Sequence, residues 1–190
     1  KSMNEAELEA LLAEMGQPRF RAAQLFKWLQ QGAEDFDEMT NLPLSLRDTL
    51  RESCYIANVT VERKLVSEID GTVKYLYKLF DGEYIESVLM KYEHGYTVCI
   101  STQVGCRMNC AFCATGVGGF MRNLSASEIL SQIHAAQNDM DIKVSHIVLM
   151  GMGEPLDNFE NVKRFLELVS DPDGLGIGYR HISLSTSGVV

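Results

Sequence analysis

Three of the five cysteines in this 190-residue sequence lie close together, at Cys106, Cys110 and Cys113 in the segment GCRMNCAFCATG. Thiolates are ligands of zinc and of iron–sulfur clusters, and both kinds of site usually take four protein ligands. Three thiolates on a [4Fe–4S] cluster leave one iron open. The spacing therefore favours a cluster whose vacant position is functional, as the open position is in catalytic zinc sites.

The vacant iron could hold the amino and carboxylate groups of S-adenosylmethionine. Electron transfer into the sulfonium would then break a carbon–sulfur bond and give a 5′-deoxyadenosyl radical. A structural zinc site, a disulfide in the loop and three buried free thiols are the alternatives. The zinc site would need Cys110, Cys113 and two further ligands, and the sequence has no second Cys-x2-Cys or His-x3-His pair.

Two other segments at expected strand ends suit the same cofactor. In GMGEP, residues 151–155, the glycines let a ligand approach the backbone, and the carboxylate of Glu154 can pair with an ammonium group. In STSG, residues 185–188, hydroxyls can bind a carboxylate or a ribose. Each segment alone is typical of an ordinary turn. Three successive strand ends with matching chemistry favour S-adenosylmethionine binding.

The composition, 46% hydrophobic and 23% charged, is that of a globular chain. No run of eighteen apolar residues exists, and the acidic start KSMNEAELEA differs from a secretory signal. We therefore expect a cytoplasmic protein without a membrane partner, in which clustered cysteines indicate metal binding or catalysis. The net charge of −9 argues against a nucleic-acid-binding surface over the whole protein but leaves a local basic groove open.

Residues 1–52 are expected to form a small helical accessory domain. Asn4 and Glu7 have the spacing of a capping box, Gly32 is a natural stop for the helix in FRAAQLFKWLQQG, and a third helix is expected to begin near Pro43. The bundle is interpreted as a packing or substrate-docking module.

Residues 53–98 are expected to form a β-meander. The run VKYLYKLF alternates apolar and polar residues, and the pairs Asp70-Gly71 and Asp81-Gly82 are hairpin signals. The apolar strand YTVCIST then leads to the cysteine loop.

From residue 99 to residue 190 strands and helices alternate. SASEILSQIHAAQ begins with a capping box from Ser125 to Glu128, and NVKRFLELV places Val162, Phe165, Leu166 and Val169 on one face. This order predicts an α/β fold with parallel βαβ units. A barrel needs more strands than are present, so we expect an incomplete parallel β/α barrel, the front part of a longer protein.

The segments YIESVLMKY, CRMNCAFCATG followed by GGFMRNL, GMGEPLDNFENV and GYRHISLSTSGV resemble the radical S-adenosylmethionine (SAM) superfamily. More narrowly, the chain resembles the dual-specificity 23S rRNA and tRNA adenine-C2 methyltransferases of the RlmN family. The resemblance implies a partial radical-SAM barrel, a [4Fe–4S] cluster and S-adenosylmethionine as cofactors, and a reductant such as flavodoxin or ferredoxin. The implied substrates are 23S rRNA and tRNA.

Site residues follow from this resemblance by position. The implied cluster ligands are Cys106, Cys110 and Cys113, and the implied cofactor contacts are Gly153, Glu154 and Ser185. Glu86 matches the family's proton-accepting glutamate, and Cys99 matches one of two catalytic cysteines. Taken alone, Glu86 would be a solvated strand residue and Cys99 a small core residue. Cys54 matches nothing and is expected to be structural.

The family's mechanism also needs a second cysteine, which carries a methyl group to adenine. The first cysteine then helps release the product, and a transient disulfide forms between the two cysteines. That cysteine is expected beyond residue 190, so we expect this chain alone to be inactive. Methylation of adenine C8, the sister activity in antibiotic resistance, and a non-catalytic iron–sulfur or zinc RNA-binding module remain alternatives. A basic RNA surface is expected in the missing part or at Arg19, Arg21 and Lys27.

Overall fold

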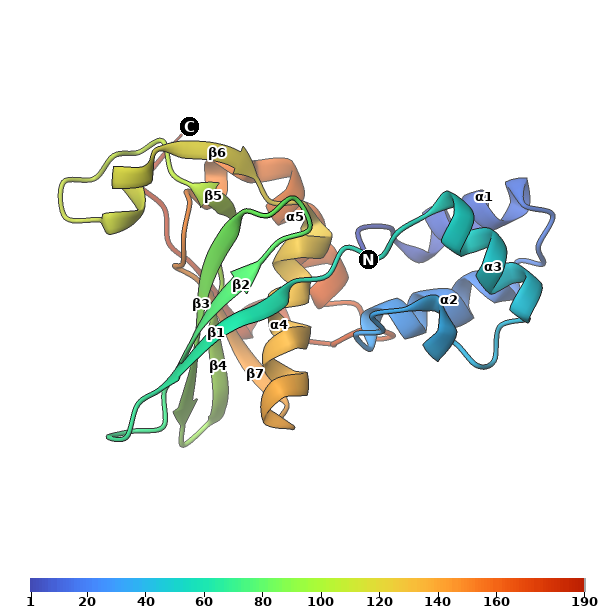
Figure 1. The fold of residues 1–190 in the computed structure, drawn as a ribbon, viewed down its shortest axis with the longest axis horizontal. Coiled ribbons are helices and arrows are strands. Elements are labelled where there is room, and N and C mark those ends of the chain that lie inside the picture. The colour runs from blue at the N-terminus through green and yellow to red at the C-terminus, as the bar shows by residue number, and fades with distance from the viewer. Residues whose placement is uncertain (190) are drawn as a thin grey trace.

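A computed structural model describes residues 1–189. A helical bundle lies at one end of the molecule, and an extended segment joins it to a twisted sheet that helices α4 and α5 cover on one side (Figure 1). The chain therefore has the mixed α/β architecture that the sequence predicts.

The bundle contains helices α1 (Glu5–Glu14), α2 (Phe20–Gln30) and α3 (Leu44–Ser53), with a 3₁₀ turn η1 (Phe36–Glu38) between the last two. Both halves of the expected capping box are present, since the Asn4 side chain accepts from the Glu7 N–H and the Glu7 carboxylate accepts from the Asn4 N–H. Gly32 follows α2 with φ +94° and so ends it.

Two polar contacts dock the bundle on the rest of the molecule. Arg164 forms an ion pair with Glu7 at 2.6 Å, and the ring Nε2 of buried His134 lies 2.9 Å from the Gln30 carbonyl oxygen. The bundle is therefore fixed to α4 and α5 rather than to the open face of the sheet.

The main sheet has the strand order β1-β2-β3-β4-β7-β8. Its strands are β1 (Thr60–Val66), β2 (Val73–Lys78), β3 (Tyr84–Tyr92), β4 (Gly95–Cys99), β7 (Val144–Leu149) and β8 (Ile182–Leu184). Neighbours from β1 to β4 are antiparallel, whereas β4, β7 and β8 are parallel. The meander and the parallel strands thus form one continuous sheet, with β4 belonging to both.

One face of this sheet packs on α4 (Ala126–Met140) and α5 (Phe159–Val169). Val73, Tyr75 and Tyr77 alternate along β2 and are at most 1% exposed, as the period of two predicts. The Tyr77 hydroxyl donates to the carbonyl of Gln132 on α4 at 3.4 Å, which satisfies the polar end of this buried ring. The opposite face of the sheet carries the polar and half-buried side chains.

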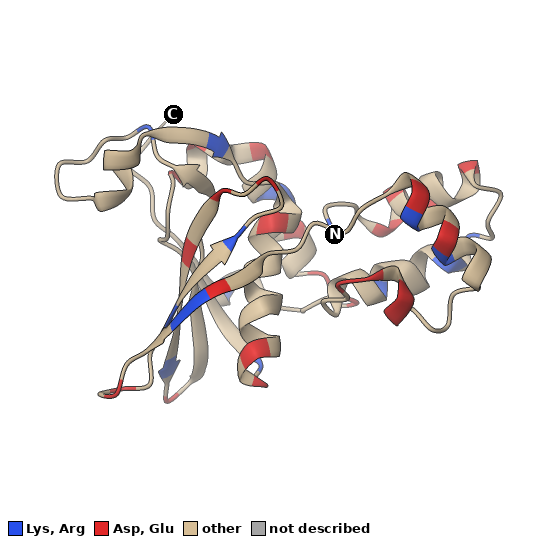
Figure 2. Ribbon diagram, in the orientation of Figure 1, with Lys and Arg blue, Asp and Glu red and all other residues tan. Residues whose placement is uncertain are grey.

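Charged residues of both signs are mixed over the bundle and the sheet (Figure 2). Arg19 pairs with Glu9 at 2.7 Å, and Arg21 donates to Gln24 and to the Asn41 carbonyl. Two of the three basic residues proposed for RNA contact are thus engaged locally. Within residues 1–189, no helix combines the length and apolarity needed to cross a bilayer.

The structure differs from the sequence expectation at the cysteine loop. Strand β4 ends at Cys99, and a separate hairpin of β5 (Gln103–Gly105) and β6 (Phe120–Asn123) follows. The loop therefore projects from a two-stranded sheet of its own. Three residues are too short a strand to show a periodic pattern, so the sequence alone does not reveal this hairpin.

Candidate functional site

The cysteine loop is anchored at its base by close backbone contact. The Cys106 N–H donates to the Gly119 carbonyl at 3.0 Å, which closes the hairpin around the loop. Gly105 has φ +74°, and a Cβ atom there would lie 1.8 Å from the Gly119 oxygen. Only glycine fits at this position, because any side chain would force the two sides of the loop apart.

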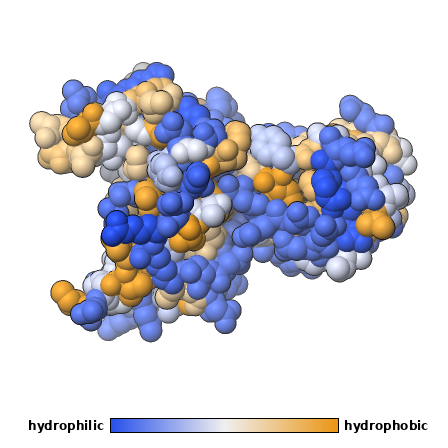
Figure 3. Space-filling view, in the orientation of Figure 1, coloured by the Kyte–Doolittle hydropathy of each residue, from blue (hydrophilic) through white to orange (hydrophobic). Residues whose placement is uncertain are grey.

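The three cysteines line one cavity of about 330 Å³. Its wall is formed by Cys106, Met108, Cys110, Phe112, Cys113, Thr115, Leu149, Met150, Gly151, Gly153, Glu154, Ser185, Thr186 and Ser187. The structure thus brings together six of the eight predicted site residues. At the outer end of the loop Phe112 and Val117 are 93% and 89% exposed, and apolar atoms gather there in Figure 3.

The thiols are all free and surround the cavity without meeting at one point. Within the described part of the chain, no three His, Cys, Asp or Glu side chains converge closely enough to hold a single metal ion. A cluster places its cysteines on different iron atoms, so its ligands stand further apart than those of one zinc ion. The cavity wall holds three cysteines and no histidine, which suits a [4Fe–4S] cluster with one open iron better than a structural zinc ion with four protein ligands.

Cys113 is prepared to act as a ligand by Thr115. Hydrogen bonds from the Thr115 side chain and backbone hold the pKa of the Cys113 thiol below its ordinary value, against a small opposing effect of burial. A lower pKa favours the thiolate, which is the form that binds metal. Thr115 was not singled out from the sequence, because a threonine two residues after a cysteine carries no specific signal.

The GMGEP turn forms the opposite wall of the cavity. Gly151 lies directly against the backbone that follows β4, since a Cβ there would stand 2.6 Å from the Ile100 oxygen. Gly153 has φ +100°, and a Cβ there would stand 2.6 Å from the Cβ of Gln103. The glycines thus serve close backbone packing within the protein as well as ligand approach.

The Glu154 carboxylate differs from the sequence expectation. It is 4% exposed, and its oxygens accept hydrogen bonds from Leu156 N at 3.0 Å, Ser187 N at 2.7 Å and Ser187 Oγ at 2.9 Å. Burial acts to raise the pKa of Glu154, but these hydrogen bonds outweigh it and hold the pKa below its ordinary value. The carboxylate therefore fastens the STSG segment, and Glu154 and Ser187 both belong to the cavity wall.

Glu86 and Cys99 lie on the face of the sheet that α4 and α5 do not cover. Cys99 pairs directly with Val88 on β3, and Glu86 is two residues from Val88 on the same strand, so all three share this face. Diagonal neighbours of this kind are about 7–8 Å apart. The Glu86 carboxylate is half exposed and pairs with Lys74 at 2.8 Å.

Neither of these two residues belongs to the cavity wall. Cys99 is half buried, and its sulfur accepts a hydrogen bond from the N–H of Met150, a residue of the cavity wall. Burial raises the pKa of the Cys99 thiol, and the Met150 hydrogen bond only partly opposes this. Cys99 is therefore a neutral thiol beside the three cysteines rather than a fourth member of the group.

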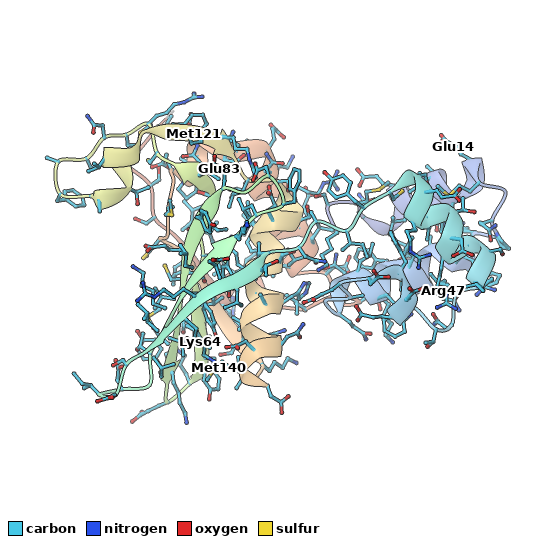
Figure 4. The ribbon with its side chains drawn as sticks, in the orientation of Figure 1. Glu14, Arg47, Lys64, Glu83, Met121 and Met140 are labelled. Atoms are coloured by element: carbon cyan, nitrogen blue, oxygen red, sulfur yellow. The ribbon has the colours of Figure 1, made fainter. Side chains whose placement is uncertain are left out.

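An ion-pair network connects the cysteine hairpin to the strand that carries Glu86. Arg122 on β6 binds Glu128 on α4 at 2.8 Å and Asp81 in the β2–β3 turn at 2.6 Å. Figure 4 labels Met121 on β6, next to Arg122 in the chain, and Glu83 in the β2–β3 connection that also carries Asp81. Glu128 is 3% exposed, so its pair with Arg122 is shielded from solvent. The partly exposed Arg122–Asp81 pair links the loop base to the sheet.

Two family models match the chain. The Ribosomal RNA large subunit methyltransferase N-terminal domain matches residues 1–56, and the Radical SAM superfamily matches residues 100–190. A protein of Alkaliphilus oremlandii, named probable dual-specificity RNA methyltransferase RlmN, is 52% identical over 100% of this chain. A protein of Clostridioides difficile with the same name is 50% identical over 100% of the chain.

The chain thus matches RlmN-family radical SAM proteins along its whole length. It spans about half the length of these relatives, 55% in both cases. A solved structure, a radical SAM methyltransferase from Sphaerobacter thermophilus, matches with a TM-score of 0.91 and 42% identity over 99% of this chain and 56% of that one. The RlmN-family fold predicted from the sequence is thereby confirmed.

Proposed function

We propose that this chain builds the cluster site and part of the cofactor site of a radical SAM methyltransferase that acts on adenine C2 in 23S rRNA and tRNA. The observation that carries the proposal is one cavity lined by three free thiols, the Gly153–Glu154 backbone and Ser185. The relatives' names support an RNA substrate. A cytoplasmic location follows from such a substrate and from the free thiols.

Cys106, Cys110 and Cys113 would hold a [4Fe–4S] cluster, which would bind S-adenosylmethionine and supply the electron for its cleavage. The Gly153–Glu154 backbone and the Ser185 side chain would position the methionine part of the cofactor. Flavodoxin or ferredoxin is the proposed reductant, and the exposed Phe112 lies in the same loop as the ligands. In this arrangement the protein supplies binding and orientation.

The open sheet face is the proposed place of the adenine. Glu86 would accept a proton there, and Cys99 would act as the thiol that releases the product. Their common face and diagonal register support this pairing of roles. The second cysteine of the mechanism is not one of the four other cysteines with a described place: three line the cavity and Cys54 ends helix α3.

One assay distinguishes the proposed adenine-C2 activity from the two alternative functions. Full-length protein, reduced and supplied with S-adenosylmethionine and unmodified 23S rRNA, should yield 2-methyladenosine in digested RNA. 8-Methyladenosine would assign the chain to the sister activity. RNA binding without any methylated adenosine would favour a non-catalytic iron–sulfur module, although that alternative gives no role to Glu86 or to the GMGEP residues in the cavity wall.

Glu86→Gln tests the proton-accepting role. In the full-length enzyme this change should leave the iron content intact and lower the rate of methyl transfer by roughly 100-fold or more, because the amide cannot take up a proton. Glu62→Gln, an exposed carboxylate on β1, is the matched control and should keep the wild-type rate. A wild-type rate in Glu86→Gln would show that this carboxylate serves only in its ion pair with Lys74.

A further inference from the structure

A buried glutamine stands between the cysteine hairpin and the GMGEP turn. Gln103 is the first residue of β5, is fully buried, and pairs with Asn123 at the end of β6. It precedes Cys106 by three residues, and no sequence motif assigns it a role. A glutamine buried at this level requires partners for its amide group.

The Gln103 side chain uses both amide protons and its amide oxygen to join three segments. Its Nε2 donates to Asn123 Oδ1 and to Asp157 Oδ2, both at 2.8 Å, and its Oε1 accepts from the Glu154 N–H at 2.9 Å. These partners belong to β6, to the 3₁₀ turn η3 (Pro155–Asn158) and to the residue just before that turn. One amide therefore joins the strand leaving the cysteine loop to the proposed cofactor-binding backbone.

Backbone hydrogen bonds also join the start of β5 to the GMGEP turn. The Gln103 N–H donates to the Met152 carbonyl at 3.2 Å, and the neighbouring Thr102 N–H donates to the same oxygen at 2.8 Å. Gly153 packs against the Gln103 side chain so closely that no Cβ fits between them. Movement of Gln103 would consequently move the Gly153–Glu154 peptide that lines the cavity.

We propose that Gln103 is a positioning residue for S-adenosylmethionine: it fixes the Gly153–Glu154 backbone relative to the cysteine loop and so sets the affinity for the cofactor. This inference rests on the proposed function, because it takes the cavity to be the cofactor site. Gln103 does not line the cavity and acts through the peptide that does.

Gln103→Met in the full-length, cluster-reconstituted protein tests this role. Methionine keeps the length of the side chain and removes its three hydrogen bonds, so the dissociation constant for S-adenosylmethionine should rise roughly 10- to 100-fold. Iron content should stay at the wild-type level, because all three cysteines remain. Gln30→Met is the matched control, since Gln30 is also buried but its amide makes no hydrogen bond in the described chain.

Gln103→Glu should make cofactor affinity depend on pH, an effect that loss of stability alone would not give. Its protonated carboxyl can donate to Asp157, whereas its ionised form would repel that carboxylate. Burial and the Asp157 charge raise the pKa of such a group. Cofactor affinity in this variant should therefore fall as the pH rises from about 6 to about 8.5, while the wild-type affinity stays nearly constant.

The possible outcomes are separable. A folded Gln103→Met protein with wild-type iron content and wild-type cofactor affinity would overturn the inference. If that variant does not fold, Asn123→Ala decides instead, because Asn123 is exposed and its loss removes one partner of Gln103. Weaker cofactor binding in Asn123→Ala would support the inference, and unchanged binding would refute it. Failure of the wild-type protein to bind S-adenosylmethionine would contradict the proposed function itself.

Discussion

Cys110→Ala in the full-length protein is expected to abolish the iron–sulfur cluster and with it all cleavage of S-adenosylmethionine. Anaerobic reconstitution of the wild type should give about four irons and four sulfides per chain. Cys110 is the middle cysteine of the loop and lines the cavity with the other two. Two remaining thiolates cannot replace it, because within the loop no other cysteine is present.

Cys54→Ala is the matched control for this experiment. Cys54 is a free thiol at the end of α3 in the helical bundle and does not line the cavity. Its replacement should leave iron, sulfide and visible absorbance at wild-type levels. Full iron content in Cys110→Ala, or loss of the cluster in Cys54→Ala, would mean that the ligands are assigned to the wrong cysteines.

Cys99→Ala is expected to keep the cluster and S-adenosylmethionine cleavage but to stop before product release. A resolving thiol must be near the substrate and free of metal, because a ligated thiolate cannot form the disulfide. Cys99 meets both conditions, since it lies on the open sheet face with Glu86 and outside the group of three cysteines. The enzyme should therefore accumulate with RNA covalently attached.

A denaturing gel of Cys99→Ala protein incubated with labelled RNA checks this expectation. The label should migrate with the protein and disappear after nuclease treatment. In the wild type, product release should become faster as the pH rises, because burial raises the pKa of the Cys99 thiol and a higher pH restores its reactive thiolate. Normal release of methylated RNA by Cys99→Ala would show that Cys99 is only a packing residue. Loss of iron in this variant would show that Cys99 is a ligand of the cluster.

Local sequence signals predicted the local structure well. The capping boxes at Asn4 and Ser125 are both present, because each depends on residues only three positions apart. The glycines at 71 and 82 have φ +71° and +89° and lie in the β1–β2 and β2–β3 connections. On α5 the prediction was less accurate: Leu168 is buried, whereas Leu166 is only partly buried.

The features that the sequence did not reveal depend on distant partners. Gln103 meets Asn123 and Asp157, which lie 20 and 54 residues away in the chain. The Glu154 carboxylate accepts hydrogen bonds from Ser187, which lies 33 residues away in the chain. No periodicity or short motif encodes such pairings, because they arise only once the strand ends are brought together at one edge of the sheet.

The register of the sheet places Glu86 and Cys99 on the same face, which their spacing in the sequence does not predict. Glu86 and Cys99 are on antiparallel neighbours, and a slip by one residue would place them on opposite faces. The site residues themselves were identified by resemblance to the RlmN family. Their roles as proton acceptor and resolving thiol remain predictions, which the substitutions above test.

The most direct test of the central claim is the detection of 5′-deoxyadenosine. Full-length protein is reconstituted with iron and sulfide without oxygen, reduced, and mixed with S-adenosylmethionine. If the cavity around the three cysteines is a radical SAM site, 5′-deoxyadenosine should form only when the reconstituted protein and the reductant are both present. Stable binding of one zinc ion, with no iron–sulfur absorbance and no 5′-deoxyadenosine, would contradict the account.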